Sequence, residues 1–284
     1  MNINEAKQQV ISACHELVGK GLVARTWGNV SCRIDDTHMA LTPSGVSYER
    51  LNNDNIVVID IDTLQYEGSV KPSSEKRIHA AVYRHFPEAG FVVHTHQTYA
   101  TMVSVAGYKE LTQRRKDAKS FDVALASYGL PGTKKLSSAV EDALGRGRDI
   151  LMERHGVLTW GATQDEAIER ALRLEELCRG FVDEVVSTGS TTGKQSVVEL
   201  VETTKPVFIP AMLDDFAQIA GFRMQPGVLP PAKVPGDEEA IRILAEKNTL
   251  AYKYAACFGK VKGLPFIDVA LMRFVYLKKY SKRY

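Results

Sequence analysis

His94 and His96 are the residues of this sequence whose types and spacing most directly suggest chemistry. They are separated by Thr95 and follow the apolar, β-branched run Phe91-Val92-Val93. Alternate side chains of an extended backbone share one face, so both imidazole rings are expected to point at one spot near a strand end. Two converging imidazoles can hold a divalent metal, zinc in particular. Two histidines in this arrangement, taken alone, are as often structural as functional, so the metal hypothesis depends on other residues.

A third imidazole and a carboxylate can complete a metal site. His155 lies in an apolar segment, and Gly156 allows the backbone there to bend or to approach another segment closely. A strand histidine beside a glycine is more often a core residue. Together with Glu75 at a predicted helix start, the three histidines nevertheless make a zinc site with an exchangeable position a plausible hypothesis. The other histidines fall in predicted helices or a turn, and we interpret them as structural or exposed: His15, His38, His79 and His85.

Three short polar clusters have the composition of a phosphate site: Gly28-Asn29, Thr42-Pro43-Ser44-Gly45 and Ser73-Ser74. Hydroxyl groups, an amide, glycine N–H groups and a helix N-terminus all suit a phosphate dianion. Each cluster on its own is more often a turn or a helix cap.

In their order along the chain, these motifs are far more specific than any one alone. The series is Trp27-Gly28-Asn29-Val30-Ser31, Leu41-Thr42-Pro43-Ser44-Gly45, Pro72-Ser73-Ser74-Glu75, His94-Thr95-His96 and Arg154-His155-Gly156. It resembles the class II aldolase/adducin family over about residues 4–186.

The resemblance implies an α/β fold, a three-layer α/β/α sandwich around a largely antiparallel sheet. It also implies a homotetramer with active sites at subunit interfaces. One Zn²⁺ per subunit would be bound by His94, His96 and His155. Glu75 would be the catalytic acid/base residue, which can also ligate the metal when substrate is absent. The phosphate group of a sugar substrate would be bound by a polar set: Asn29, Ser44, Gly45, Ser73 and Ser74.

The reaction implied is cleavage of a small ketose phosphate, similar to fuculose 1-phosphate, into dihydroxyacetone phosphate and an aldehyde. The metal would polarise substrate oxygens while Glu75 moves the proton. A sugar-phosphate decarboxylase, dehydratase or 4-epimerase of the same fold is the first alternative. The epimerase pattern has aspartate after the paired serines, where this chain has Glu75. A non-catalytic, adducin-like scaffold is the second, although it would not need to retain three histidines and Glu75.

Two features depart from the family pattern. Family aldolases use tyrosines from the loop between the second and third histidines and from the C-terminal tail. Here the loop at 107–120 is charged and offers Tyr108 as a loose candidate, and residues 206–284 match no known tail.

Hydrophobic periodicity predicts the elements that must position these residues. A helix at 4–18 precedes short strands at 29–34, 39–42 and 56–61, the last pairing with 64–66. A second helix is expected to open at 71–75, before the strand that carries His94. The later elements are a helix at 99–105, a strand at 121–126, a helix at 137–144, a strand at 150–160 interrupted at His155, and a helix from 163 to 185.

The chain is expected to divide into three parts. Residues 1–186 form the aldolase-like catalytic domain, and the polar, glycine-containing stretch beyond it begins a linker at 187–205. Residues 206–284 form a helical C-terminal extension, with helices at 214–220, 237–258 and 266–280. We interpret its basic end as a solvated helix terminus rather than a contact for a membrane or an acidic partner.

Composition excludes several classes of function. The 284 residues carry a net charge of +2, so we expect no strongly basic surface of the kind that binds nucleic acid. No apolar run approaches the ~20 residues that span a bilayer, and the N-terminus lacks a signal-peptide pattern. Four scattered cysteines are typical of reduced thiols in a cytoplasmic protein.

Overall fold

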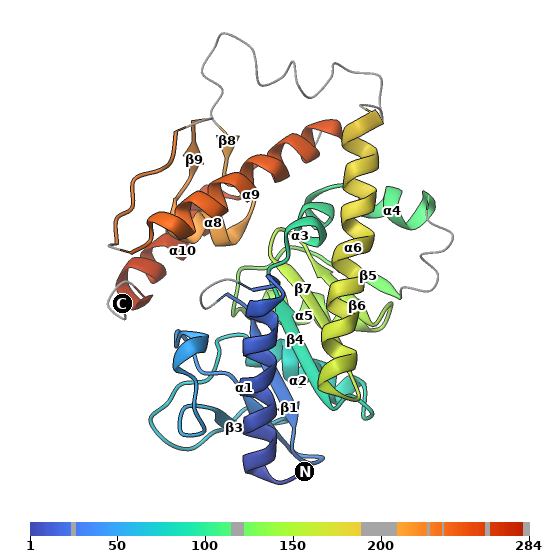
Figure 1. Ribbon diagram of the computed structural model, residues 1–284, viewed down its shortest axis with the longest axis vertical. Helices are drawn as coiled ribbons and strands as arrows, with labels where there is room; N and C mark the ends of the chain where they lie inside the picture. Colours follow the sequence, from blue (N-terminus) through green and yellow to red (C-terminus); the bar gives the residue numbers. More distant parts are fainter. Residues whose placement is uncertain are drawn as a thin grey trace. The chain divides into compact units, whose positions relative to one another are not determined.

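A computed structural model of the chain describes residues 1–23, 27–114, 122–188, 209–225, 228–234, 236–258 and 262–280 (Figure 1). The chain forms two compact units. The first comprises Met1–Ala100 with Arg115–Glu176, and the second comprises Thr101–Arg114 with Leu177–Tyr284. Most of the predicted linker, from residue 189 to 205, lies outside the described residues. The predicted domain boundaries therefore stay a prediction.

The first unit is built on a seven-stranded sheet with the order β3-β2-β1-β4-β7-β6-β5 among its described residues. All neighbouring strands are antiparallel except β5 and β6, which are parallel. The strands are β1 Asn29–Arg33, β2 His38–Leu41, β3 Val57–Asp60, β4 Phe91–Thr95, β5 Val123–Ala126, β6 Asp149–Met152 and β7 Gly156–Gly161. The largely antiparallel sheet expected from the sequence is confirmed.

Helices cover both faces of this sheet. One face packs on α1 (Ile3–Gly19) and on the first part of α6 (Gln164–Thr188), and the other packs on α2 (Lys76–His85) and α5 (Lys134–Leu144). Along β4, Phe91 and Val93 join the core on the α1 side while Val92 joins the core on the α2 side. This alternation follows from the two-residue period of a strand. The three-layer sandwich is therefore confirmed, and His94 falls on the α2 face.

The second unit contains the helical C-terminal extension. The helices of this unit are α4 Tyr108–Arg114, α8 Asp214–Ile219, α9 Glu238–Cys257, α10 Phe266–Val275, a π-helical turn Tyr276–Tyr280, most of α3 (Thr98–Val105) and the end of α6 from Leu177. Asn248 on α9 accepts a hydrogen bond from the Met212 N–H (2.8 Å) and donates one to the Pro210 carbonyl (3.0 Å). A buried ion pair joins Lys247 to Asp215 at 2.8 Å. The predicted helices of the extension are confirmed.

Four local expectations were wrong or incomplete. Residues 64–66 form a single bridge, Ile59 to Tyr66, rather than a strand. The helix that residues 71–75 open begins at Lys76, with Glu75 rather than Ser73 or Ser74 in the capping position. The expected loop at 107–120 contains α4, and its residues 115–120 lie outside the described part. A two-stranded sheet, β8 Ile209–Pro210 with β9 Arg223–Met224, is too short for periodicity to detect.

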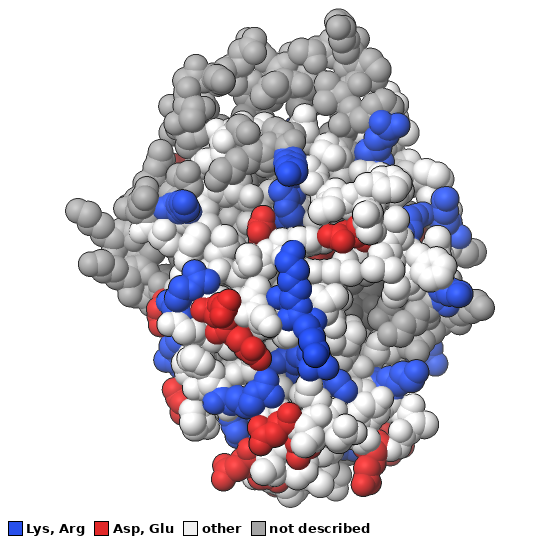
Figure 2. Space-filling view, turned by 180° about the vertical axis from the view of Figure 1, so that it is seen from behind, with Lys and Arg blue, Asp and Glu red and all other residues white. Residues whose placement is uncertain are grey.

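The described surface carries charges of both signs. Basic and acidic side chains are interspersed on the face shown in Figure 2, as the net charge of +2 leads one to expect. Within the described residues, no helix combines the length and the apolar character that crossing a membrane requires.

Candidate metal and substrate site

His94 sits in β4, near its C-terminal end, between two antiparallel neighbours. It is paired in register with Asn29 of β1 and with Leu158 of β7. Its ring is fully buried, and Nδ1 lies 2.8 Å from the Val157 carbonyl oxygen. A carbonyl can only accept, so His94 Nδ1 carries the hydrogen and Nε2 carries a lone pair. The strand therefore holds His94 in one tautomer, in which Nε2 could bind a metal.

His96 lies one residue beyond the end of β4, in the short connection to α3, and hydrogen bonds hold the residues before and after it. Thr95 donates to the Gln97 side-chain oxygen at 2.7 Å, and Gln97 in turn donates to the Ala171 carbonyl at 3.0 Å. The first N–H groups of α3 donate to the Glu175 carboxylate at 3.0 and 2.9 Å. These bonds fix the chain on either side of His96, which is only half-buried.

His155 is presented by the tight connection between β6 and β7. Arg154 adopts a positive φ of 64°, which is uncommon for a residue with a side chain. Gly156 is required by space, because an added Cβ would lie 2.3 Å from the Thr95 carbonyl oxygen and 3.1 Å from His94 Cε1. The close backbone approach expected of this glycine is observed.

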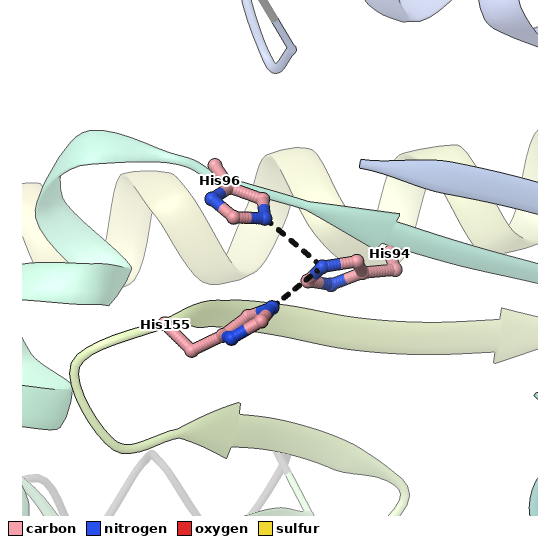
Figure 3. Close-up of side chains that lie close together, drawn as sticks. All are labelled: His94, His96 and His155. Carbon is pink, nitrogen blue, oxygen red and sulfur yellow. Dashed lines mark hydrogen bonds between the residues drawn. The ribbon is translucent and has the colours of Figure 1, made fainter. Parts of the chain in front are cut away.

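The three imidazoles converge on one point (Figure 3). His94 Nε2 lies 3.0 Å from His96 Nε2 and 3.0 Å from His155 Nε2. Ligand nitrogens about 2.0–2.1 Å from a tetrahedral zinc stand about 3.3 Å apart, close to this spacing. Within the described residues this is the one group of histidine, cysteine or acidic side chains with the spacing of a metal site.

The Glu75 carboxylate closes the site. Its Oε1 lies 3.1 Å from His155 Nε2, and its Oε2 lies 3.3 Å from His94 Nε2. The backbone N–H of Glu75 donates to Ser73 Oγ at 3.2 Å, which fixes the start of α2. Burial on its own raises the pKa of a carboxyl group, yet the adjacent His155 and His94 hold the pKa of Glu75 well below its usual range.

The hydrogen-bond chemistry of these atoms suits a cation. His94 Nε2 has one lone pair, which cannot accept good hydrogen bonds from His96 and His155 at once. Three imidazole nitrogens and one carboxylate are a donor set that zinc accepts. These residues therefore fit a bound divalent metal.

The three polar clusters also meet. Val30 and Thr42 exchange two hydrogen bonds, Val30 N–H to Thr42 Oγ1 at 3.2 Å and Thr42 N–H to the Val30 carbonyl at 3.1 Å. The Ser73 N–H donates to the Thr42 carbonyl at 3.0 Å, and the Ser44 N–H donates to the Lys71 carbonyl at 2.8 Å. Residues 28–29, 42–45 and 72–74 therefore lie side by side. Within this set Asn29, Ser44 and Ser73 are buried, Gly45 is half-buried and Ser74 is exposed.

Two residues make contacts that the sequence-based interpretation did not include. Asn29, expected only in the phosphate set, donates its side-chain amide to Glu75 Oε2 at 2.9 Å. His79, interpreted as structural or exposed, is fully buried and bonded to Asn29 Oδ1. The sequence could have indicated that His79 lies near Glu75, because residues four apart at a helix start lie on the same side. Tyr108, the candidate tyrosine of the loop at 107–120, is the first residue of α4, which belongs to the second unit.

Fold and site together define a three-layer α/β protein with three converging histidines that could bind a metal. Comparison with known proteins is consistent with this class. The family model for the class II aldolase and adducin N-terminal domain matches residues 8–182. The chain belongs to this family.

Named relatives carry two activities. The chain is 35% identical over 192 residues to an L-ribulose-5-phosphate 4-epimerase of Salmonella paratyphi B, covering 62% of this chain and 84% of the relative. It is 34% identical over 190 residues to an L-fuculose phosphate aldolase of Escherichia coli, covering 66% and 87%. Among solved structures, an L-fuculose 1-phosphate aldolase is similar with a TM-score of 0.56 and 26% identity, covering 69% of this chain and 93% of that one.

Proposed function

We propose that this protein is a zinc-dependent class II aldolase that cleaves a small ketose phosphate into dihydroxyacetone phosphate and an aldehyde. The observation that carries the proposal is the convergence of His94, His96 and His155 on one point with the Glu75 carboxylate beside it. The similarity to L-fuculose phosphate aldolase supports the reaction class.

The residues have separate roles in this proposal. His94, His96 and His155 hold the cation, which when bound polarises the substrate carbonyl and the adjacent hydroxyl and stabilises negative charge on those oxygens. In cleavage, the hydroxyl group β to the carbonyl loses its proton, the C–C bond breaks, an aldehyde leaves, and the three-carbon fragment regains a proton at carbon. We assign proton transfer to Glu75, since it is an ionised carboxylate beside the point where the imidazoles meet.

The substrate phosphate is assigned to Asn29, Ser44, Gly45, Ser73 and Ser74. The contact between their segments supports this assignment, because hydroxyl and N–H donors then share one place beside the metal ligands. Asn29 has two amide hydrogens, so it can donate one to Glu75 and one to a phosphate oxygen.

A second candidate is a 4-epimerase acting on a ketose 5-phosphate. The 35% identity to L-ribulose-5-phosphate 4-epimerase favours it, whereas Glu75 stands where the epimerase pattern has aspartate. A decarboxylase or dehydratase would use the same metal. A scaffold without activity is the least consistent, because the histidines and Glu75 would then have no reason to converge.

The experiment that tests the proposal is a panel of ketose 1-phosphates and 5-phosphates incubated with the purified protein. Release of dihydroxyacetone phosphate and an aldehyde is the expected outcome. Inversion of one carbon without fragments would identify an epimerase instead. No change in any substrate, with metal bound, would contradict both enzyme proposals.

The proposal includes a homotetramer with active sites at subunit interfaces, from the family resemblance. A cytoplasmic location is consistent with four free cysteines, Cys14, Cys32, Cys178 and Cys257.

A further inference from the structure

A line of buried polar side chains leads from the site into the space between β1 and α2. Glu75 caps α2, and His79 and Tyr83 follow it at intervals of four residues, which places those two on one side of the helix. Asn29 and Ser31 alternate on β1 and share one face of the sheet. All five side chains are between 0% and 8% exposed. Burying so many polar groups is costly unless they bond to one another.

The five side chains form one continuous line of hydrogen bonds. Tyr83 OH lies 2.9 Å from Ser31 Oγ, which lies 2.7 Å from His79 Nδ1. The other ring nitrogen, His79 Nε2, bonds to Asn29 Oδ1. The amide nitrogen of Asn29 lies 2.9 Å from Glu75 Oε2. The line therefore joins the Tyr83 hydroxyl to the carboxylate at the metal site.

The placement of the Asn29 amide sets the direction of these bonds. Its Nδ2 donates to Glu75 Oε2, which leaves Oδ1 as the acceptor that faces His79. His79 therefore carries a hydrogen on Nε2. In the neutral ring Nδ1 then keeps a lone pair, to which Ser31 can donate while it accepts from Tyr83. This arrangement of hydrogens satisfies all five groups.

We propose that His79, held by Ser31 and Tyr83, is a positioning residue that sets the Asn29 amide and, through it, the orientation of the Glu75 carboxylate. This inference rests on the proposed function, in which Glu75 moves the proton. Asn29 holds Oε2, and Oε1 is left facing His155 Nε2. A carboxylate that must exchange a proton with substrate gains from such fixation, because small misplacements cost large factors in rate.

The environment of His79 agrees with this role. Burial, with the neighbouring His94, lowers the pKa of His79 to about 3, while Glu75 acts in the opposite direction. The ring is therefore neutral at the pH of the cell, which gives Nδ1 the lone pair that accepts from Ser31. Partners that orient a metal-site residue typically change activity by about 10- to 100-fold when removed.

Two substitutions at His79 separate positioning from folding. His79→Asn can place an amide near the position of Nδ1 but is too short to reach Asn29, whereas His79→Gln can place an N–H near the position of Nε2. We expect His79→Asn to lower kcat by about 10- to 100-fold with metal content and KM close to those of the wild type. His79→Gln should keep most of the wild-type kcat. Equal kcat values for the two variants, whether both high or both low, would overturn the positioning role.

A measurement independent of activity completes the test. Solid-state ¹⁵N NMR of histidine-labelled protein at pH 7, with the His79 signals assigned by their loss in His79→Gln, should show hydrogen on Nε2 only. Hydrogen on Nδ1, or on both nitrogens, would refute the line of bonds whether or not the protein is an aldolase. A wild type that turns over no panel substrate contradicts the proposed function instead, and the NMR result then decides the line of bonds alone.

Further variants serve if His79→Asn does not fold. Ser31→Ala removes the donor to His79 Nδ1, while Tyr83→Phe removes the hydroxyl at the far end of the line. We expect Ser31→Ala to lower kcat more than Tyr83→Phe does. The reverse order would contradict the inference.

Discussion

Replacing Glu75 with glutamine separates the catalytic role of this residue from a purely structural one. Glutamine keeps the shape of the side chain, and its carbonyl oxygen can still accept from Asn29, as Glu75 Oε2 does at 2.9 Å. It cannot accept a proton. Loss of a general acid or base costs about 10²–10⁴ in rate. At 1.36 kcal/mol per factor of ten, this raises the barrier by about 3–5 kcal/mol.

The structural alternative predicts a much smaller effect. A carboxylate at a helix start stabilises the helix by about 0.3–1 kcal/mol, and its loss would leave turnover unchanged. The Glu75 carboxylate makes no capping hydrogen bond to α2 and instead faces His94 and His155. Glu238→Gln is a matched control, because Glu238 is an exposed carboxylate in the first turn of α9.

The assay is the initial rate of dihydroxyacetone phosphate release from the best panel substrate, with metal content measured on the same samples. We expect Glu75→Gln to stay folded, retain most of its metal and lose at least about a hundredfold in kcat. Glu238→Gln should match the wild type. Near wild-type turnover in Glu75→Gln would refute the assignment of proton transfer to this residue.

Three further predictions concern substrate, stability and assembly. Ser73→Ala combined with Ser74→Ala should raise KM more than it lowers kcat, and equal wild-type activity on phosphorylated and free sugars would contradict a phosphate site. The pKa of His79 is about 3 in the folded protein, against 6.5 for a histidine in an unfolded chain. The contribution of His79 to the free energy of unfolding is therefore complete above pH 6.5 and falls as the pH drops toward 3. Relative to His79→Gln, the wild type should lose about 1.4 kcal/mol of unfolding free energy per pH unit in that range, and an unchanged difference between pH 7 and pH 5 in urea unfolding would refute the buried neutral ring. Light scattering should give a tetramer that a truncation after Ser187 disrupts, and a monomeric full-length protein would refute the assembly.

Short-range patterns predicted most of the helices and strands, and the resemblance of the ordered motifs to a known family predicted the sandwich fold and the convergence of His94, His96 and His155. The two-residue period of a strand brought His94 and His96 to one place, even though β4 ends at Thr95. Gly156, the glycine after His155, indicated a close approach between two backbone segments, and the space where a Cβ would stand is taken up by the Thr95 carbonyl. The polar clusters were found by composition and are joined by backbone hydrogen bonds.

The remaining features depend on contacts between distant segments. His79 is polar, and on a helix it is equally consistent with an exposed position; its burial follows from the packing of α2 on β1, through Asn29 and Ser31. Periodicity also could not resolve β8 and β9, which have two residues each. The role of Asn29 at Glu75 required the register between β1 and β4, which no local pattern encodes.

The most direct test of the central claim is metal analysis of protein purified without added metal. Three converging imidazoles predict about one equivalent of zinc per chain. His94→Ala and His155→Ala should each strip it, while His85→Ala, at an exposed position on α2, should retain it. Full metal retention in both His94→Ala and His155→Ala would contradict the site.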